Sequence, residues 1–262
     1  MQRSSHRLPA YVFGLSLSLG VLALPSVSHA QGHEAPFLPP QGWSFDGLFG
    51  TFDRASMQRG FQVYKEVCSN CHSMKQMYYR NLTGIGLSEE QVKAVAAGID
   101  VTSGTDDAGN PVQHPAAPSD RFRAPYADEK AARAANGGAL PPDQSLIIKA
   151  REHGPDYVFW LMQGYRDAPA GVKVGDGQYY NEYFPGGQLA MSQPLHDGAV
   201  TYADGTPATV VQMSRDIVQF LTWTANQEME QRKRMGVKVV LFLILMTGLA
   251  IATKKAIWKD VH

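Results

Sequence analysis

The chain contains only two cysteines, and both belong to one motif, Cys68-Ser69-Asn70-Cys71-His72. The spacing C-x-x-C-H is the attachment sequence of a c-type haem, in which two thiols add to the vinyl groups of one porphyrin. On one helical turn Cys68 and Cys71 lie on the same face, and His72 follows where its imidazole can bind the iron as proximal ligand. The motif therefore predicts that the chain folds around one covalently attached haem.

Two other interpretations of the cysteine pair are a redox dithiol and half of a zinc site. A thioredoxin-like dithiol is expected at the start of a helix that follows a strand, and a zinc site needs further ligands nearby. Neither context surrounds residues 68–72. Haem attachment is therefore favoured, and it leaves no cysteine for a structural disulfide.

The first thirty residues have the pattern of a secretory signal peptide, which we predict at residues 1–30. Arg3 and Arg7 form a basic start, residues 11–24 are apolar, and Ser28-His29-Ala30 is similar to an A-x-A cleavage site. An uncleaved anchor is the alternative, but the apolar stretch is short for a bilayer span. The pattern predicts an exported haem domain at residues 31–231.

A second apolar run, residues 239–253, is uncharged and lies between two basic clusters, at residues 232–234 and 254–259. It predicts a transmembrane anchor at residues 235–254 and a tail at 255–262, although a core helix of a soluble domain is possible for so short a run. The two clusters nearly balance under the positive-inside rule, so the signal peptide sets the orientation. We expect a single-pass protein of a bacterial inner membrane, with a periplasmic haem domain and a cytoplasmic C-terminus.

The whole chain has a formal net charge of zero, but its charges are unevenly distributed. Residues 31–231 hold fifteen Lys and Arg against twenty-three Asp and Glu, and the compensating positive charge lies at the two ends. Such an acidic domain is usually only well solvated. Here it also predicts electrostatic attraction to a basic soluble partner, weakened by salt, and no nucleic acid partner is expected.

Helical patterns dominate the exported part, and we predict an all-α domain of the class I cytochrome c type, with loop insertions. Asp53 can cap a helix running to the haem motif, and a second helix is expected from Pro207, after Thr206 as N-cap, to about Glu230. A shorter helix is predicted at residues 156–164. Residues 100–118 are interpreted as an exposed insertion, and residues 170–187 as an aromatic loop that wraps the haem face opposite His72.

A low-spin electron carrier needs a second axial ligand, and a thioether in that position raises the reduction potential. Met191 lies among glycines and a proline shortly before the last predicted helix, where class I cytochromes usually keep this ligand. Met162 and Met213 have the spacing of core residues. From position alone Met191 is favoured, with His196 and His153 as competing ligands.

Longer stretches of the sequence resemble the cytochrome c1 family of the cytochrome bc1 complex, the ubiquinol–cytochrome c oxidoreductase. The matching stretches follow the family's order and span nearly all of residues 43–258: residues 43–47, 59–68, 133–143, 156–159, 183–191, 204–209 and 232–236. Departures are confined to the N-terminal arm and the loop at 100–118. The resemblance supports Met191 as the distal ligand, and it implies that Arg151 and Tyr157 contact a haem propionate. It also implies pocket-lining roles for Asn136, Ala139, Pro141, Pro142, Ile148, Phe184, Leu189 and Pro194.

The resemblance implies an electron-transfer subunit with no catalytic residues of its own. Its haem would accept one electron from the Rieske iron–sulfur protein and pass it to a cytochrome c, while cytochrome b performs the quinol chemistry within a dimeric complex. Two rival functions remain open. One is another membrane-anchored monohaem cytochrome, and the other is a haem enzyme or gas sensor with an open distal site.

Overall fold

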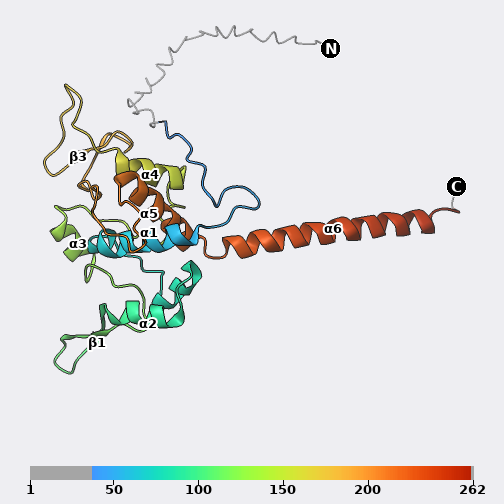
Figure 1. Cartoon of the computed structure of the whole chain (residues 1–262), viewed down its shortest axis with the longest axis horizontal. Coiled ribbons are helices and arrows are strands. Elements are labelled where there is room, and N and C mark those ends of the chain that lie inside the picture. The colour runs from blue at the N-terminus through green and yellow to red at the C-terminus, as the bar shows by residue number, and fades with distance from the viewer. Residues whose placement is uncertain (1–36, 261–262) are drawn as a thin grey trace, which may run out of the picture. The chain divides into compact units, whose positions relative to one another are not determined.

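The structure is a computed structural model that describes residues 37–260. The predicted signal peptide lies outside the described residues. The elements, in chain order, are α1 (Arg54–Glu66), two 3-10 segments (Cys68–Asn70 and Tyr79–Ile85), α2 (Glu89–Ala97), β1 (Asp100–Thr105), β2 (Pro111–Pro115), α3 (Glu129–Ala135), α4 (Gly154–Gln163), β3 (Tyr179–Tyr180), β4 (Gln188–Leu189), α5 (Val210–Ala225) and α6 (Met229–Ile257) (Figure 1).

Helix α1 begins where the sequence predicts, because the Asp53 side chain accepts a hydrogen bond from the Ser56 backbone N–H at 3.1 Å. Its buried face includes Met57, Phe61 and Tyr64, which recur at the three- and four-residue spacing of one helical face. The helix ends at Glu66, so the haem motif follows on a separate tight turn. Helix α4 also lies close to its predicted range.

Helix α5 begins and ends inside the range predicted for it, so the expected bounds were wrong. Thr209, not Thr206, caps the helix by accepting a hydrogen bond from Gln212 N–H at 3.2 Å. The Thr206 N–H instead donates to Asp204 at 3.0 Å, which holds residues 204–206 in a turn. At the other end Asn226 caps α5, and α6 starts three residues later.

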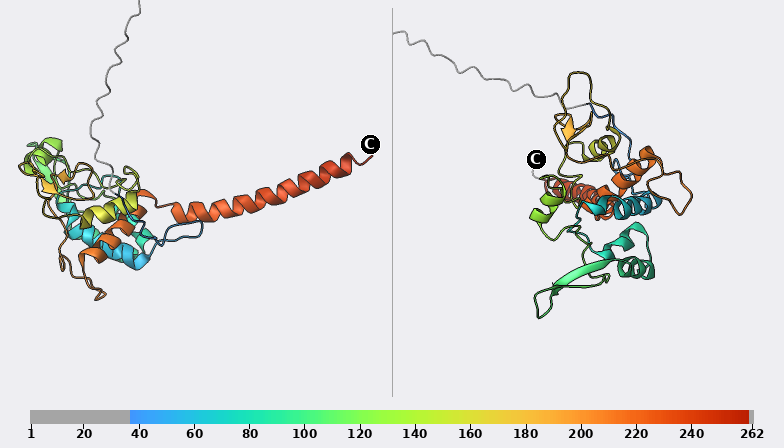
Figure 2. Two further views of the ribbon diagram at one scale, coloured as in Figure 1. Left: turned by 90° about the horizontal axis from the view of Figure 1, so that it is seen from above. Right: turned by 90° about the vertical axis from the view of Figure 1, so that its left-hand side faces the viewer.

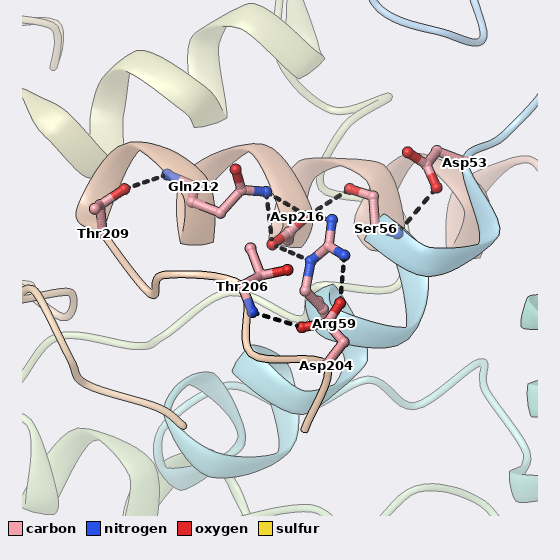
Figure 3. A network of polar contacts seen from close by, with 8 residues as sticks. All are labelled: Asp53, Ser56, Arg59, Asp204, Thr206, Thr209, Gln212 and Asp216. Atoms are coloured by element: carbon pink, nitrogen blue, oxygen red, sulfur yellow. Dashed lines mark hydrogen bonds and ion pairs between the residues drawn. The ribbon is translucent and has the colours of Figure 1, made fainter. Parts of the chain in front are cut away.

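Helices α1 and α5 make the most extensive contact between helices. They approach closely at Gly60, where a Cβ atom would lie 2.0 Å from the Asp216 carbonyl oxygen. Asp216 is fully buried and accepts hydrogen bonds from Ser56 at 2.6 Å and from Arg59 at 2.9 and 3.0 Å (Figure 3). The first and last helices of the domain are thus joined through a buried ion pair.

The expectation of an all-α domain was wrong, because the described residues include two small antiparallel sheets. The predicted insertion at 100–118 forms the hairpin β1–β2, with Asp100 opposite Pro115 and a register shift between Thr102 and Thr105. The Asp106 side chain accepts hydrogen bonds from backbone N–H groups at the turn, which stabilises it. The second sheet pairs β3 with β4, within and just beyond the predicted aromatic loop.

Helix α6 contains 29 residues, includes the whole predicted anchor, and is long and apolar enough to cross a membrane. Met235 and the large apolar side chains from Val239 onward are exposed, as expected for a lipid-facing helix rather than a core helix. Its first turn differs, since Met229 is buried against the domain core. Views at right angles show α6 extending from the end of α5 (Figures 1 and 2).

Candidate haem site

The cysteine motif forms one tight turn directly after α1. Cys68 to Asn70 make a 3-10 turn, and the Cys68 carbonyl accepts hydrogen bonds from the N–H groups of Cys71 at 3.1 Å and His72 at 2.9 Å. Both cysteines are free, and Cys71 is exposed. The turn places two thiols and one imidazole on a short rigid segment, as attachment of a single porphyrin requires.

The local chemistry gives no support to the redox or zinc interpretations of this motif. Burial raises the pKa of the Cys68 thiol to about 12, whereas a reactive dithiol needs a lowered pKa. Within residues 37–260, no group of three or more His, Cys, Asp or Glu side chains is arranged to hold a metal ion. The turn is suited to thioether attachment.

The His72 ring is oriented by a backbone carbonyl from a distant part of the chain. Its Nδ1 atom lies 2.8 Å from the Pro142 carbonyl oxygen, which can only accept, so Nδ1 must carry the proton. Burial lowers the pKa of His72 and outweighs the opposite effect of this hydrogen bond, so the ring is neutral at pH 7. The Nε2 lone pair is therefore available to a metal, as in histidine ligands whose other nitrogen is fixed by a carbonyl.

The segment that carries Pro142 is held against the haem motif by Asp143. One oxygen of this carboxylate accepts hydrogen bonds from the Ser73 hydroxyl and the Lys75 N–H, both at 2.8 Å, and the other accepts from the Ser145 N–H at 2.9 Å. Gln144 N–H also donates to the Ser73 carbonyl at 2.8 Å. Asp143 thereby fixes the distance between His72 and its hydrogen-bond acceptor.

Beside His72 lies a largely apolar cavity of about 390 Å³, within the usual size range of cofactor sites. Of the predicted site residues it is lined by Cys71, His72, Asn136, Ala139, Pro141, Pro142, Arg151, Tyr157, Phe184, Leu189 and Met191. Cys68, Ile148 and Pro194 are not among its lining residues. The exposed side chains of Cys71, Leu140 and Pro142 lie at its mouth.

Met191 reaches this cavity from the segment that follows β4. The Tyr165 hydroxyl donates to the Met191 carbonyl at 3.0 Å, and buried Asn181 ties the preceding loop to α4 by donating to the Leu161 carbonyl at 2.8 Å. His153 and His196 are exposed and do not line the cavity. The structure thus brings the predicted thioether, but neither competing histidine, to the same cavity as His72.

The two residues predicted to contact a propionate lie together on the cavity wall. Burial raises the pKa of Tyr157, although nearby Arg151 opposes that effect. Arg151 has no carboxylate partner within the described part of the chain, so its charge is available to an acidic group of a ligand.

Sequence reasoning missed several wall residues: Leu140, Gln144, Ile147, Val158, Leu161, Met162, Ala190, Ser192 and Leu221. Three of them could have been found from the sequence, because Val158, Leu161 and Met162 lie at helical spacing on the apolar face of α4. Met162 was interpreted as a core residue, and it lies on the cavity wall as a second thioether. The contribution of Leu221 depends on how α5 packs, which the sequence pattern does not encode.

A neutral imidazole with a fixed Nδ1, an accessible thiol beside it, a thioether and apolar walls fit a covalently bound haem. The fold and this site define a c-type cytochrome with a candidate membrane-spanning helix. Comparison with known proteins is more specific, because the Cytochrome C1 family model matches residues 43–261. The chain belongs to the cytochrome c1 family.

Several relatives resemble the chain over most of its length. "Cytochrome c1 1, heme protein, mitochondrial" of Arabidopsis thaliana is 49% identical over 243 residues, covering 91% of this chain and 78% of that protein. "Cytochrome c1" of Rhodospirillum rubrum is 43% identical over 264 residues, covering 95% of each. "Cytochrome b/c1" of Bradyrhizobium diazoefficiens is 46% identical over 269 residues, 94% of this chain but 39% of that protein. Members of the family carry one covalently attached c-type haem and are the electron-transfer subunit of the bc1 complex.

Proposed function

We propose that this chain receives one electron from the Rieske iron–sulfur protein and delivers it to a cytochrome c, and that His72 and Met191 would hold its haem iron. The observation that carries the proposal is the cavity that His72, with its Nδ1 fixed on Pro142, shares with Met191. When bound, the haem supplies reversible one-electron chemistry. The chain alone is a carrier and catalyses no reaction.

Different residues of the chain would hold different parts of the haem. Cys68 and Cys71 provide the thioether links, and Arg151 and Tyr157 provide donors for a propionate at the cavity wall. Asn136, Pro141, Pro142, Phe184 and Leu189 contribute to the walls, which exclude water and favour the less charged reduced state. Pro194 and Ile148 do not line the cavity, and they would contribute through packing in the domain.

Electron exchange is expected near the mouth of the cavity. Cys71 and Pro142 are exposed there, and Leu140 is 37% exposed, so a partner can approach the edge of the attached group without opening the core. The acidic composition of residues 31–231 favours a basic acceptor. Cytochrome b would be the neighbour within a dimeric complex, with α6 anchored in a bacterial inner membrane, the haem domain periplasmic and the C-terminus cytoplasmic.

The proposed acceptor is tested by stopped-flow mixing of the reduced complex with a soluble basic cytochrome c at increasing ionic strength. As the Debye length falls from about 30 Å to about 8 Å, the bimolecular rate constant should fall clearly. A matched reaction with a small neutral oxidant should not respond to salt. A flat profile with cytochrome c would contradict electrostatic recognition, and absence of transfer would contradict the proposed acceptor.

The rival with an open distal site makes a different spectroscopic prediction. A six-coordinate iron with Met191 in place should leave the reduced spectrum unchanged on adding carbon monoxide. A shift in the wild-type protein would favour a gas sensor or haem enzyme. Co-purification with a dihaem cytochrome b separates the bc1 assignment from other anchored monohaem cytochromes.

A further inference from the structure

The loop before α1 exposes two large apolar side chains at its tip. Leu48 is 61% exposed and Phe49 is 80% exposed, whereas Phe45 and Phe52 on either side are buried. We call Leu48 and Phe49 the apolar tip. Two adjacent large apolar residues held in water are unfavourable, and they commonly mark a surface that is covered in the working protein.

Hydrogen bonds and a close backbone approach define the conformation of this loop. Its base is closed by a hydrogen bond from Thr51 N–H to the Ser44 carbonyl at 2.9 Å, and the Asp46 carboxylate accepts from Trp43 N–H at 2.9 Å. At Gly50 the backbone passes so close to residue 46 that a Cβ atom would lie 2.0 Å from the Asp46 carbonyl oxygen. The exposure of the apolar tip is therefore fixed by the backbone around it.

A lysine of α6 fastens this loop to the start of the candidate membrane span. The Lys233 ammonium donates to the Phe45 carbonyl at 2.7 Å and to the Gly50 carbonyl at 3.1 Å, the two residues that flank the tip. Two views show the loop beside the first turns of α6 (Figures 1 and 2). The exposed apolar side chains of α6 begin at Met235, two residues after Lys233.

The distance along α6 from Lys233 to the start of the uncharged run indicates that the apolar tip lies at the membrane surface. At about 1.5 Å of rise per residue, Lys233 lies about 9 Å along α6 from Val239, where the uncharged run begins. The interfacial region adds about 5–8 Å on each side of the hydrocarbon core, and apolar groups of peripheral elements enter about 5–10 Å into this zone. Lys233 therefore lies near the outer edge of the interfacial zone, where a long lysine side chain can keep its charge in water.

We propose that the apolar tip inserts into the interfacial zone of the membrane, as a second contact with lipid that sets the tilt of the haem domain over the bilayer. The inference rests on the proposed role of α6 as a membrane anchor. Lipid is favoured over a protein partner because Lys233 holds the loop at the start of the exposed apolar part of α6, and the segment from Gly47 to Gly50 contains no charge.

The test uses the full chain in its lipid-reconstituted complex, with one new cysteine at a time carrying a nitroxide spin label. Haem occupies the native cysteines, and unlabelled wild type checks this. Phe49→Cys reports the tip and Leu245→Cys the middle of α6. Val211→Cys is the control, because Val211 is also an exposed apolar residue but lies in the first turn of α5, the end far from α6. Collision rates with oxygen and with a water-soluble nickel chelate are then compared.

We expect the label at Phe49 to collide with the nickel chelate severalfold less than the label at Val211, and to retain access to oxygen. Lys233→Met should increase the mobility of the Phe49 label and its access to the chelate. If Leu245 lies in lipid while Phe49 is open to the chelate, or shielded from both reagents by protein, the inference is overturned and the anchor stands. If Leu245 is open to the chelate, the membrane role of α6 fails and the inference fails with it.

Discussion

The buried ion pair between α1 and α5 gives a quantitative prediction for the stability of the domain. Replacing Arg59 by Met keeps the apolar stem of the side chain but removes two charge-assisted hydrogen bonds to Asp216 (Figure 3). Asp216 has no exposed surface, so its carboxylate would remain buried with only Ser56 and Gln212 as donors. The hydrogen bond to Asp216 is also the main reason why the pKa of Arg59 is raised, which keeps the guanidinium charged.

The expected cost follows from these contacts. Two hydrogen bonds to a charged group contribute about 1.5–3 kcal/mol each, and breaking a buried ion pair costs about 3–5 kcal/mol. The second pair of Arg59, with Asp204, lies at the surface and adds little. We therefore expect Arg59→Met to lower the free energy of unfolding by about 4 kcal/mol. For a domain of this size that corresponds to a fall in Tm of about 8–16 °C.

The assay is denaturant unfolding of the purified full chain in detergent, followed by near-ultraviolet circular dichroism. Arg54→Met is the matched control, because Arg54 pairs with Glu230 from a side chain that is 46% exposed, and its loss should cost less than about 1 kcal/mol. Adding Asp216→Leu to Arg59→Met should recover part of the loss, because no uncompensated charge remains. If Arg59→Met costs no more than Arg54→Met, the reasoning is refuted.

Two further predictions concern the domain boundary and the haem-motif loop. A chain ending after Arg234 should be soluble and keep a c-type spectrum. It should unfold at a higher denaturant concentration than a chain ending after Gln231, because only the longer chain retains the Lys233 hydrogen bonds. Equal unfolding midpoints of the two chains would contradict this. Burial raises the pKa of Asp143, but hydrogen bonds from Ser145, Lys75 and Ser73 outweigh it, so the net pKa is lowered. Its stabilisation is present above the ordinary value of about 3.9 and is lost as pH falls through the lowered pKa. The stability gap between wild type and Asp143→Asn, measured by denaturant titration, should therefore be largest near neutrality and close in acid, and a gap independent of pH would count against it.

Local patterns predicted those parts of the fold that depend on neighbouring residues. The start of α1 follows from Asp53, and the haem turn follows from its own five residues. The start of α5 was misplaced because Thr206 and Thr209 can both cap a helix, and the sequence does not show that Asp204 holds the Thr206 N–H. The hairpin at 100–118 was missed because its glycine- and aspartate-rich composition is equally typical of an irregular loop.

The sequence predicted many residues of the site, but not the hydrogen bonds and packing that hold them in position. His72 and Pro142 are seventy positions apart, so their hydrogen bond depends on tertiary packing. The same applies to Asp143 and to the wall residues from α4 and α5. Sequence reasoning favoured Met191 over the histidines from its place before the last helix, and the structure adds Met162 as a rival thioether on the same cavity.

Redox titration of Met191→Leu, compared with Met162→Leu, tests the central claim most directly. The cysteines remain, so haem should be incorporated in both variants. Met191→Leu should lower the midpoint potential by about 0.1–0.3 V, within the wide range that axial ligands control, and should allow carbon monoxide to bind. Since about 59 mV changes a one-electron equilibrium tenfold, electron transfer from the Rieske centre should stall. Met162→Leu should leave the potential near that of wild type. An unchanged potential in Met191→Leu, or a large fall in Met162→Leu, would contradict the assignment of Met191 as the distal ligand.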